Sequence, residues 1–204
     1  MERLIEGFKR FRTQYFQEHR ARFERLSERG QRPRYGVVTC ADSRIDTTRV
    51  FDAVPGEIFL IRNIANLVPP YQPDDRQHAT SAAIEYAVRF LKIGQLVVLG
   101  HAGCGGISAL LDPPKQPTDF VASWLEIARP ARERVLANTS LSVEERQRQC
   151  ELEALKSSID NVLQFPWVAA RVEDGSLLAD ALYLDLEHGE LLLYSRAKDR
   201  FEPV

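Results

Sequence analysis

The sequence predicts an α/β protein with a mainly parallel β-sheet, an antiparallel edge strand, helices on both faces and an N-terminal helical arm. Short apolar runs rich in β-branched residues alternate with longer amphipathic segments, which is typical of parallel sheets covered by helices. Two of these runs break into polar turns of small residues. The last two runs are joined by His188-Gly189, which favours an antiparallel hairpin at the sheet edge.

Length and charge limit the possible classes of protein. The chain has 204 residues, enough for one domain with a sizeable core, and we expect a single domain over 1–204 in which 1–30 form the arm. A formal net charge of −2 gives no reason to expect a nucleic-acid partner. No apolar run approaches the roughly 20 residues of a membrane span, and the charged N-terminus lacks the apolar region of a signal peptide. We therefore expect a soluble, cytoplasmic protein.

The N-terminal residues 2–29 carry a helical pattern. Aromatic and aliphatic residues recur there at steps of three and four, with Arg and Glu between them. Gly30 and Pro33 mark the end of the helix. Two interpretations of this aromatic helix are open: it packs on its own domain, or it is an arm that lies across a partner subunit.

The remaining elements follow from periodicity and from turn residues. Apolar runs predict strands at 35–40, 58–61, 96–99, 181–186 and 190–194. Helical patterns predict helices at 45–51, 80–91, 107–111, 120–137 and 142–163. A proline-rich loop is expected at 112–119 and a short turn at 168–172.

Cysteine and histidine stand at the ends of two predicted strands. Cys40 ends the first strand, and His101 and Cys104 follow the third. If these strands are parallel neighbours, their carboxyl ends lie side by side, where open α/β sheets place their sites. Two cysteines and one histidine form a plausible zinc set with one open position, the pattern of catalytic zinc. Three cysteines are too few for a disulfide framework, and Cys150 is interpreted as a small buried hydrophobe.

Two charged residues follow the first cysteine. Asp42 could be a fourth ligand, which would close the site. Alternatively, Arg44 holds Asp42 in a bidentate pair, and Asp42 accepts a hydrogen bond from zinc-bound hydroxide without binding zinc. In that role Asp42 would also act as a gate, since an ionised carboxylate accepts a hydrogen bond only from a protonated oxygen.

The sequence resembles the β-class carbonic anhydrases over nearly its whole length. The resemblance is carried by Cys40-Ala41-Asp42-Ser43-Arg44, Pro55-Gly56-Glu57, Arg62-Asn63-Ile64-Ala65-Asn66, Ala83-Ile84-Glu85-Tyr86-Ala87-Val88 and His101-Ala102-Gly103-Cys104-Gly105-Gly106. It implies zinc-dependent reversible hydration of carbon dioxide to bicarbonate and a proton, by attack of zinc-bound hydroxide on CO2. Cys40, His101 and Cys104 would bind one zinc ion per chain, with Asp42 and Arg44 as the catalytic dyad.

The resemblance also indicates the plant-type sub-type and its substrate pocket. Gln31, Phe59, Ile64 and Tyr86 fall where plant-type members bind substrate. The backbone N–H of Gly105 would help to position the substrate oxygen. Part of the pocket in this sub-type comes from the neighbouring subunit. We therefore expect a homodimer or a dimer of dimers, with the N-terminal helix as the dimerisation arm.

Two expectations concern pH. Zinc with two thiolates and one neutral imidazole has no net charge, so it withdraws electrons less strongly than zinc with three imidazoles, and its bound water should be harder to deprotonate. We therefore predict hydration activity that rises into the alkaline range. Members of the other sub-type, which bicarbonate suppresses, carry a tryptophan where this chain has Val37, so we expect a site that stays open near neutral pH.

Three other functions could use the same residues. A hydrolase of carbon disulfide or carbonyl sulfide on the same scaffold would share the zinc chemistry. A non-catalytic zinc-binding protein would have no use for the charged pair after Cys40. A thiol enzyme with Cys40 as nucleophile is disfavoured because the three residues between Cys40 and Arg44 are too few for the phosphate loop of cysteine phosphatases.

Overall fold

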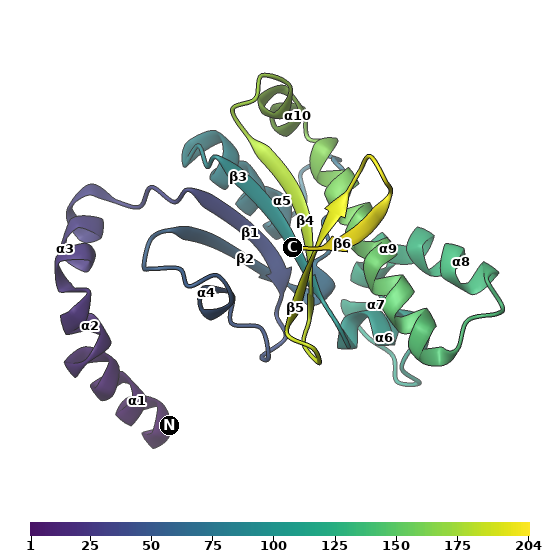
Figure 1. The fold of residues 1–204 in the computed structure, drawn as a ribbon, viewed down its shortest axis with the longest axis horizontal. Coiled ribbons are helices and arrows are strands. Elements are labelled where there is room, and N and C mark those ends of the chain that lie inside the picture. The colour runs from purple at the N-terminus through teal and green to yellow at the C-terminus, as the bar shows by residue number, and fades with distance from the viewer.

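The computed structural model describes residues 1–204 and contains one six-stranded sheet (Figure 1). Its strands are β1 (Tyr35–Cys40), β2 (Ile58–Asn63), β3 (Gln95–His101), β4 (Leu178–Asp185), β5 (Glu190–Ser195) and β6 (Arg200–Pro203). The spatial order is β2-β1-β3-β4-β5-β6. The first four strands in this order are parallel, and β5 and β6 run antiparallel to their neighbours. The predicted fold class is confirmed.

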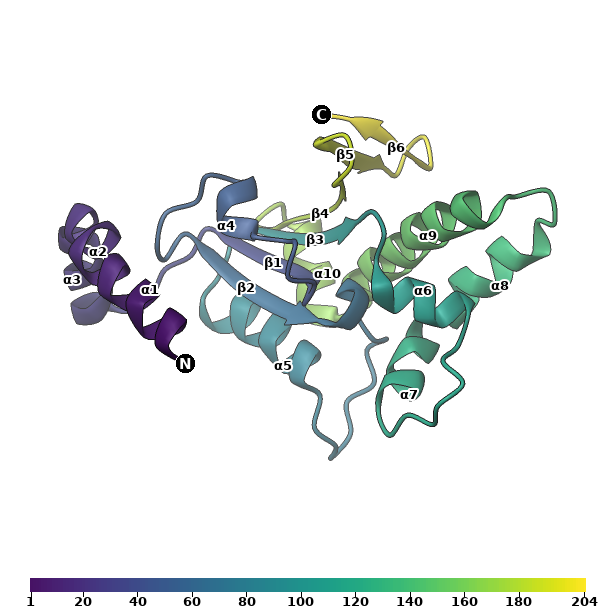
Figure 2. The same cartoon turned by 90° about the horizontal axis from the view of Figure 1, so that it is seen from below.

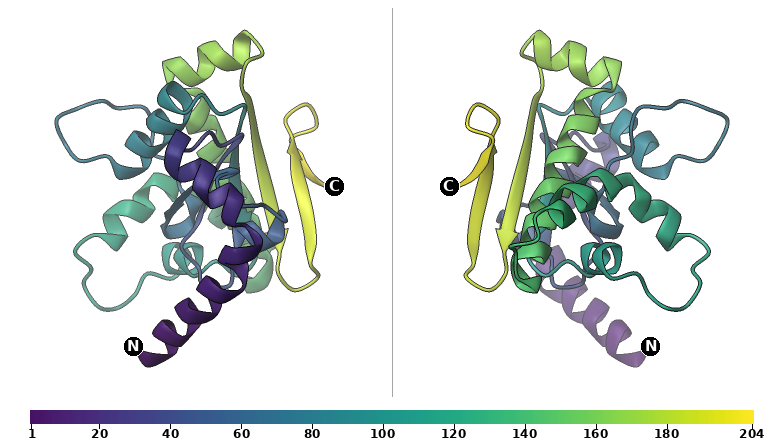
Figure 3. Two further views of the ribbon diagram at one scale, coloured as in Figure 1. Left: turned by 90° about the vertical axis from the view of Figure 1, so that its left-hand side faces the viewer. Right: turned by 90° about the vertical axis from the view of Figure 1, so that its right-hand side faces the viewer.

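The edge of the sheet differs from the prediction by one strand. The hairpin of β4 and β5 is present, but β5 is covered by β6, which forms the edge (Figure 3). The segment Arg200–Pro203 is short, charged and ends in proline. Such residues suit an edge strand, whose outer hydrogen-bonding groups face solvent, but they do not form the apolar run by which strands are recognised.

The chain contains ten α-helices, of which the first three stand apart from the sheet. They are α1 (Glu2–Thr13), α2 (Tyr15–Glu18), α3 (Arg20–Arg29), α4 (Thr47–Val50), α5 (Ala79–Glu85), α6 (Gly105–Leu111), α7 (Val121–Leu125), α8 (Arg129–Ala137), α9 (Val143–Leu163) and α10 (Pro166–Glu173). Short 3-10 turns lie at η1 (Ile64–Asn66) and η3 (Glu126–Ala128), and a π-helical turn, η2 (Tyr86–Phe90), continues α5. None of the helices combines the length and apolar character needed to cross a membrane.

Two prolines begin helices where the sequence suggested otherwise. Pro166 starts α10, so the short turn expected at 168–172 is an eight-residue helix. Pro130 lies in the first turn of α8, and the single helix expected over 120–137 is divided into α7, η3 and α8. Proline is tolerated in a first turn because its missing N–H would have no helical partner there. These two element predictions were therefore wrong.

The two faces of the sheet are covered unequally (Figure 2). Helices α5, α9 and α10 pack against one face and form the largest apolar cluster with β1, β3 and β4. The opposite face carries α4 and a smaller cluster around Val37, Val97 and Leu99. At the carboxyl ends of the strands, α6, α7, α8 and α9 enclose a third cluster that contains Cys40 and Cys104. The predicted metal ligands thus lie where the sheet meets a helical layer.

The N-terminal segment is an arm of three helices instead of the predicted single helix. Breaks at Gln14 and His19 separate α1, α2 and α3. They fold the arm so that the ring centroid of Phe11 lies 6.2 Å from that of Phe16 and 6.0 Å from that of Phe23. No residue of the three helices is buried, and the arm stands apart from the sheet (Figure 1).

The end of the arm nearest the sheet touches the domain. Leu26 of α3 packs against Gly56, where an added Cβ would lie 2.6 Å from the leucine side chain. Arg22 donates a hydrogen bond to the carbonyl of Pro55. The aromatic residues of α1 have no such contact, with Phe8 60% exposed. The interpretation that the whole helix packs on its own domain is therefore wrong for α1.

Candidate metal centre and active site

The ends of two neighbouring strands place the three predicted ligands together. Cys40 is the last residue of β1 and His101 the last of β3, and these strands pair in parallel. The chain then turns through Gly103, whose φ of +65° is the left-handed conformation that glycine adopts most readily. This turn returns Cys104, at the start of α6, to a position where its Sγ lies 3.9 Å from the Sγ of Cys40.

The three side chains form a buried group that fits a metal ion. One donor atom from each of Cys40, His101 and Cys104 lies within 4.8 Å of the other two. The Nδ1–H of His101 donates to the carbonyl of Ala102 at 3.0 Å, which leaves the lone pair on Nε2. That Nε2 is buried without a hydrogen-bond partner. An orphaned imidazole nitrogen beside two sulfur atoms is the donor set that zinc prefers.

The pKa values of the two cysteines differ because they interact. A hydrogen bond from the thiol of Cys104 is the main reason why the pKa of Cys40 lies well below its ordinary value. The pocket therefore stabilises a thiolate. Cys150 lies in the same apolar cluster without such donors, and burial raises its pKa to about 12. Its interpretation as a buried hydrophobe is confirmed by its complete burial.

Asp42 and Arg44 form the bidentate pair considered from the sequence. Arg44 donates from Nε to Asp42 Oδ1 at 3.0 Å and from Nη2 to Oδ2 at 2.7 Å. These hydrogen bonds are the main reason why the pKa of Asp42 lies well below its usual range. Arg44 Nη2 also donates to the carbonyl of Gly103 at 2.8 Å. Asp42 is thus ionised and fixed, with its Oδ2 3.9 Å from Nε2 of His101.

Sequence reasoning assigned no role to Arg62, which supports the turn after β1. Its Nε donates to the carbonyl of Cys40 at 3.1 Å, and its Nη2 donates to the carbonyl of Asp42 at 2.7 Å. Both carbonyls belong to the strand end that presents the proposed ligand and the carboxylate. The available signal was a charged residue near the end of β2, the strand that pairs with β1.

Ile64 and Gly105, two of the expected substrate-binding residues, lie beside the cluster. Ile64 begins η1, in which Ala65 has a φ of 61°. Gly106 packs so closely against this turn that an added Cβ would lie 2.9 Å from side-chain atoms of Ile64 and Ala65. The indole N–H of Trp124 donates to the carbonyl of Ile64 at 2.8 Å. The turn at Ile64 is therefore held by both α6 and α7.

The other three expected substrate residues lie elsewhere in the same chain. Phe59 pairs with Gly36, four residues from the end of β1, which at about 3.3 Å per residue places it about 13 Å along the sheet from Cys40. The ring of Tyr86 lies 5.9 Å from that of Phe59. Gln31 precedes β1 and lies toward the amino ends of the strands. A single chain does not bring these side chains to the cysteine–histidine group.

An α/β sheet with a buried Cys-His-Cys group at its carboxyl edge, next to an ionised Asp–Arg pair, defines a metal-dependent enzyme. Residues 35–191 match the carbonic anhydrase family. Beta carbonic anhydrase 3 of Arabidopsis thaliana is 34% identical over 200 residues, which cover 95% of this chain and 76% of that protein. The chain belongs to the carbonic anhydrase family, and its relatives place it in the β class.

Solved structures agree with this assignment. The beta-carbonic anhydrase CcaA matches with a TM-score of 0.93 and 34% identity, over 100% of this chain and 99% of that one. CafA of Aspergillus fumigatus matches with a TM-score of 0.77 and 30% identity, over 94% and 89%. The resemblance inferred from the motifs is confirmed. The protein is a zinc-dependent enzyme of reversible CO2 hydration, and the three alternative functions are not favoured.

Proposed function

We propose that Cys40, His101 and Cys104 bind the zinc ion of this carbonic anhydrase, and that Asp42 and Arg44 form its catalytic dyad. The observation that supports this assignment is the buried group whose donor atoms lie within 4.8 Å of one another. Zinc bound there would lower the pKa of a water molecule and so supply the nucleophile.

The residues around the metal orient the two reactants. Asp42, held ionised by Arg44, accepts a hydrogen bond from the nucleophile and so fixes its direction of attack. The backbone N–H of Gly105, in the first turn of α6, donates to an oxygen of the substrate. Ile64 provides an apolar wall for CO2. These roles need groups that are fixed before substrate arrives, and the Asp–Arg pair meets that requirement.

The direct test is stopped-flow CO2 hydration by purified protein between about pH 6.5 and 9, with zinc measured on the same sample. We expect one zinc per chain and activity that rises with pH, because two thiolates cancel the charge of the metal. A flat pH profile would contradict the charge argument. Zinc-loaded protein without hydration at any pH would contradict the proposed function, and carbon disulfide would then be the next substrate to test.

We propose that the active unit is a homodimer or a dimer of dimers in which Gln31, Phe59 and Tyr86 of one chain complete the pocket of the other. Their distance from the cysteine–histidine group of their own chain supports this arrangement. A beta-carbonic anhydrase of Sordaria macrospora, 25% identical over 94% of this chain and 95% of that one with a TM-score of 0.82, is described as tetrameric.

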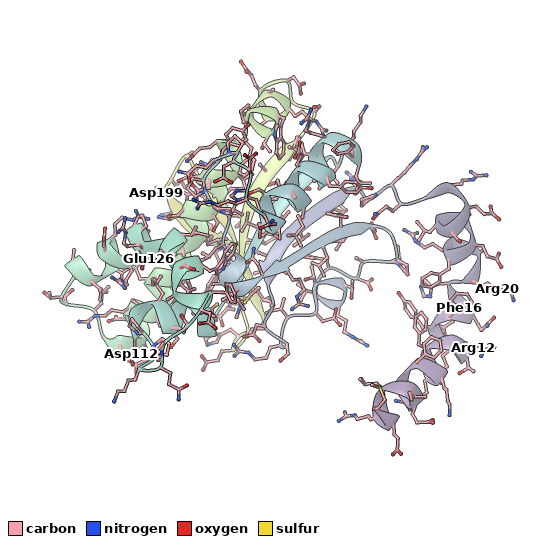
Figure 4. All side chains as sticks on the ribbon, turned by 180° about the vertical axis from the view of Figure 1, so that it is seen from behind. Arg12, Phe16, Arg20, Asp112, Glu126 and Asp199 are labelled. Carbon is pink, nitrogen blue, oxygen red and sulfur yellow. The ribbon has the colours of Figure 1, made fainter.

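Charge supports the arm as the element that joins two copies. Residues 1–34 contain ten basic and five acidic side chains, whereas the rest of the chain contains 17 basic and 24 acidic ones. Figure 4 shows Arg12 and Arg20 on the arm and the acidic Asp112, Glu126 and Asp199 on the opposite part of the molecule. A basic arm with exposed aromatic residues complements the acidic body of a second copy.

Phe8→Asp is expected to weaken dimerisation by about 2 kcal/mol, roughly thirtyfold, because the arm would lose an apolar anchor and bury a charge. Phe8 is 60% exposed on α1. The matched control is Phe120→Asp, since Phe120 is 81% exposed but lies outside the arm. Analytical ultracentrifugation should show a dimer dissociation constant roughly thirtyfold higher for the first variant alone. Equal dimerisation of both variants would exclude the arm from the interface.

We further propose the plant-type sub-type, with a site open near neutral pH. The formed Asp42–Arg44 pair supports this, because a carboxylate engaged with arginine is less available as a fourth ligand. The similarity to the Arabidopsis thaliana protein agrees with it.

The cytoplasm is the proposed location because thiolate ligands need reduced cysteines, and all three cysteines are free.

A further inference from the structure

A buried carboxylate of α9 contacts the peptide that carries one of the proposed ligands. Glu151 is 4% exposed. Its Oε1 accepts a hydrogen bond from the backbone N–H of Cys104 at 2.8 Å and another from Nε2 of Gln147 at 2.6 Å. Its Oε2 accepts from the hydroxyl of Tyr183 at 2.7 Å. All three donors are neutral, and each carboxylate oxygen has a partner.

The same group holds the Cys104 peptide from both sides. While Glu151 accepts from its N–H, Gln147 Nε2 donates to its carbonyl at 3.1 Å. Gln147 and Glu151 are one turn apart on α9, so a single rigid helix contacts both polar groups of that residue. The backbone of Cys104, and with it the direction of its Sγ, is therefore determined by α9 as well as by the β3–α6 turn.

This carboxylate forms no direct ion pair with a basic side chain. The nearby Arg148 pairs with Asp185 at 2.8 Å and not with Glu151. Burying a charge without an ion pair is costly, and hydrogen bonds from neutral groups offset only part of that cost. The surrounding residues of α9, Cys150, Ala154 and Leu155, pack in apolar clusters that do not require an acid. The feature that distinguishes Glu151 from these neighbours is its contact with the Cys104 peptide.

We propose that Glu151 is a positioning residue of the metal centre. It fixes the Cys104 peptide so that the thiolate points toward Cys40 Sγ and His101 Nε2. The inference rests on the proposed function, in which Cys104 is a zinc ligand. Outer groups that orient a ligand in this way are as much a part of a metal site as the ligands themselves.

The experiment compares Glu151→Leu, Glu151→Gln and Tyr183→Phe in the zinc enzyme. Glu151→Leu removes the acceptor of the Cys104 N–H, whereas Tyr183→Phe removes another hydrogen bond to the same carboxylate and leaves Cys104 in contact. We expect Glu151→Leu to weaken zinc binding about 10- to 100-fold, measured by competition with a chromophoric chelator. Tyr183→Phe should change zinc affinity less than about threefold while lowering the thermal midpoint.

Two further readouts separate positioning from general stability. After cobalt replacement, Glu151→Leu should alter the intensity of the sulfur-to-cobalt absorption bands, which depend on the direction of the thiolates, and Tyr183→Phe should not. Glu151→Gln keeps an acceptor oxygen at the same distance along the side chain. It should therefore retain most of the zinc affinity that Glu151→Leu loses. Should Glu151→Leu not fold, Glu151→Asp withdraws the carboxylate by one methylene and is expected to weaken zinc binding about tenfold.

Equal zinc affinities and equal cobalt spectra in Glu151→Leu and Tyr183→Phe would overturn the inference. Cys104→Ser serves as the reference. If Cys104→Ser loses zinc and Glu151→Leu binds it with unchanged affinity, the positioning role fails and the ligand assignment stands. If Cys104→Ser keeps zinc with unchanged affinity, the proposed ligand set itself is wrong.

Discussion

Asp42→Asn is expected to lower kcat/KM for CO2 hydration by about 100- to 10,000-fold while zinc stays bound. The amide has nearly the same volume as the carboxylate, but it carries no charge for Arg44 and presents an N–H where one carboxylate oxygen accepted. It therefore loses the fixed acceptor that orients the nucleophile. Stopped-flow hydration and the zinc content of the same sample measure the two effects separately.

Asp46→Asn is the matched control for this variant. Asp46 caps the N-terminus of α4, where its side chain accepts from the backbone N–H of Arg49. Asparagine caps helices as well as aspartate does, so stability should change by less than about 0.5 kcal/mol, with activity unchanged. Full activity of Asp42→Asn would remove Asp42 from the mechanism, and loss of zinc in that variant would make it a ligand.

Cys104→Ser is expected to reduce zinc affinity by more than about 100-fold, since removing a ligand should exceed the effect of removing a group that orients one. A serine hydroxyl is far harder to deprotonate than a thiol, and zinc in proteins binds thiolate, imidazole and carboxylate groups. Hydration activity should fall with the bound zinc. The measurement is zinc per chain after dialysis, followed by titration with zinc and a competing chelator.

Cys150→Ser makes the same atomic change at a cysteine outside the ligand group. Cys150 is completely buried in the apolar cluster that also contains Cys104. A hydroxyl placed there without a partner should cost about 1–3 kcal/mol of unfolding free energy. Zinc stoichiometry should stay at one per chain. A loss of zinc in Cys150→Ser with retention in Cys104→Ser would show that the ligand assignment is wrong.

Strands β1 and β3 and the turns that follow them could be predicted from the sequence, because the residue pattern and the sheet topology point to the same structure there. The residues of β1 and β3 are buried on both faces, which requires continuous apolar runs, and the polar turns after them must meet at one edge of a parallel sheet. The prolines at 130 and 166 were misinterpreted because the same residue can end one helix or begin the next. Local sequence alone does not decide between these roles.

The roles of Arg62 and Glu151 could not be predicted from the sequence, for a different physical reason. Their partners near the metal group are backbone groups, the carbonyls of Cys40 and Asp42 and the N–H of Cys104. Every residue except proline has both groups, so such contacts leave no pattern in the partner's sequence. In the proposed dimer, the role of Phe59 also depends on the second copy, because Phe59 of one chain would complete the pocket of the other.

If the exposed aromatic arm joins two copies, as proposed, the stability and activity of each chain depend on protein concentration. In the proposed dimer, association stabilises the folded chain, so the measured stability rises with the logarithm of protein concentration. Activity per chain should then fall on dilution, with a delay set by how slowly the two copies separate. The carbon dioxide flux through a cell would therefore depend more than linearly on the amount of enzyme when the enzyme is scarce.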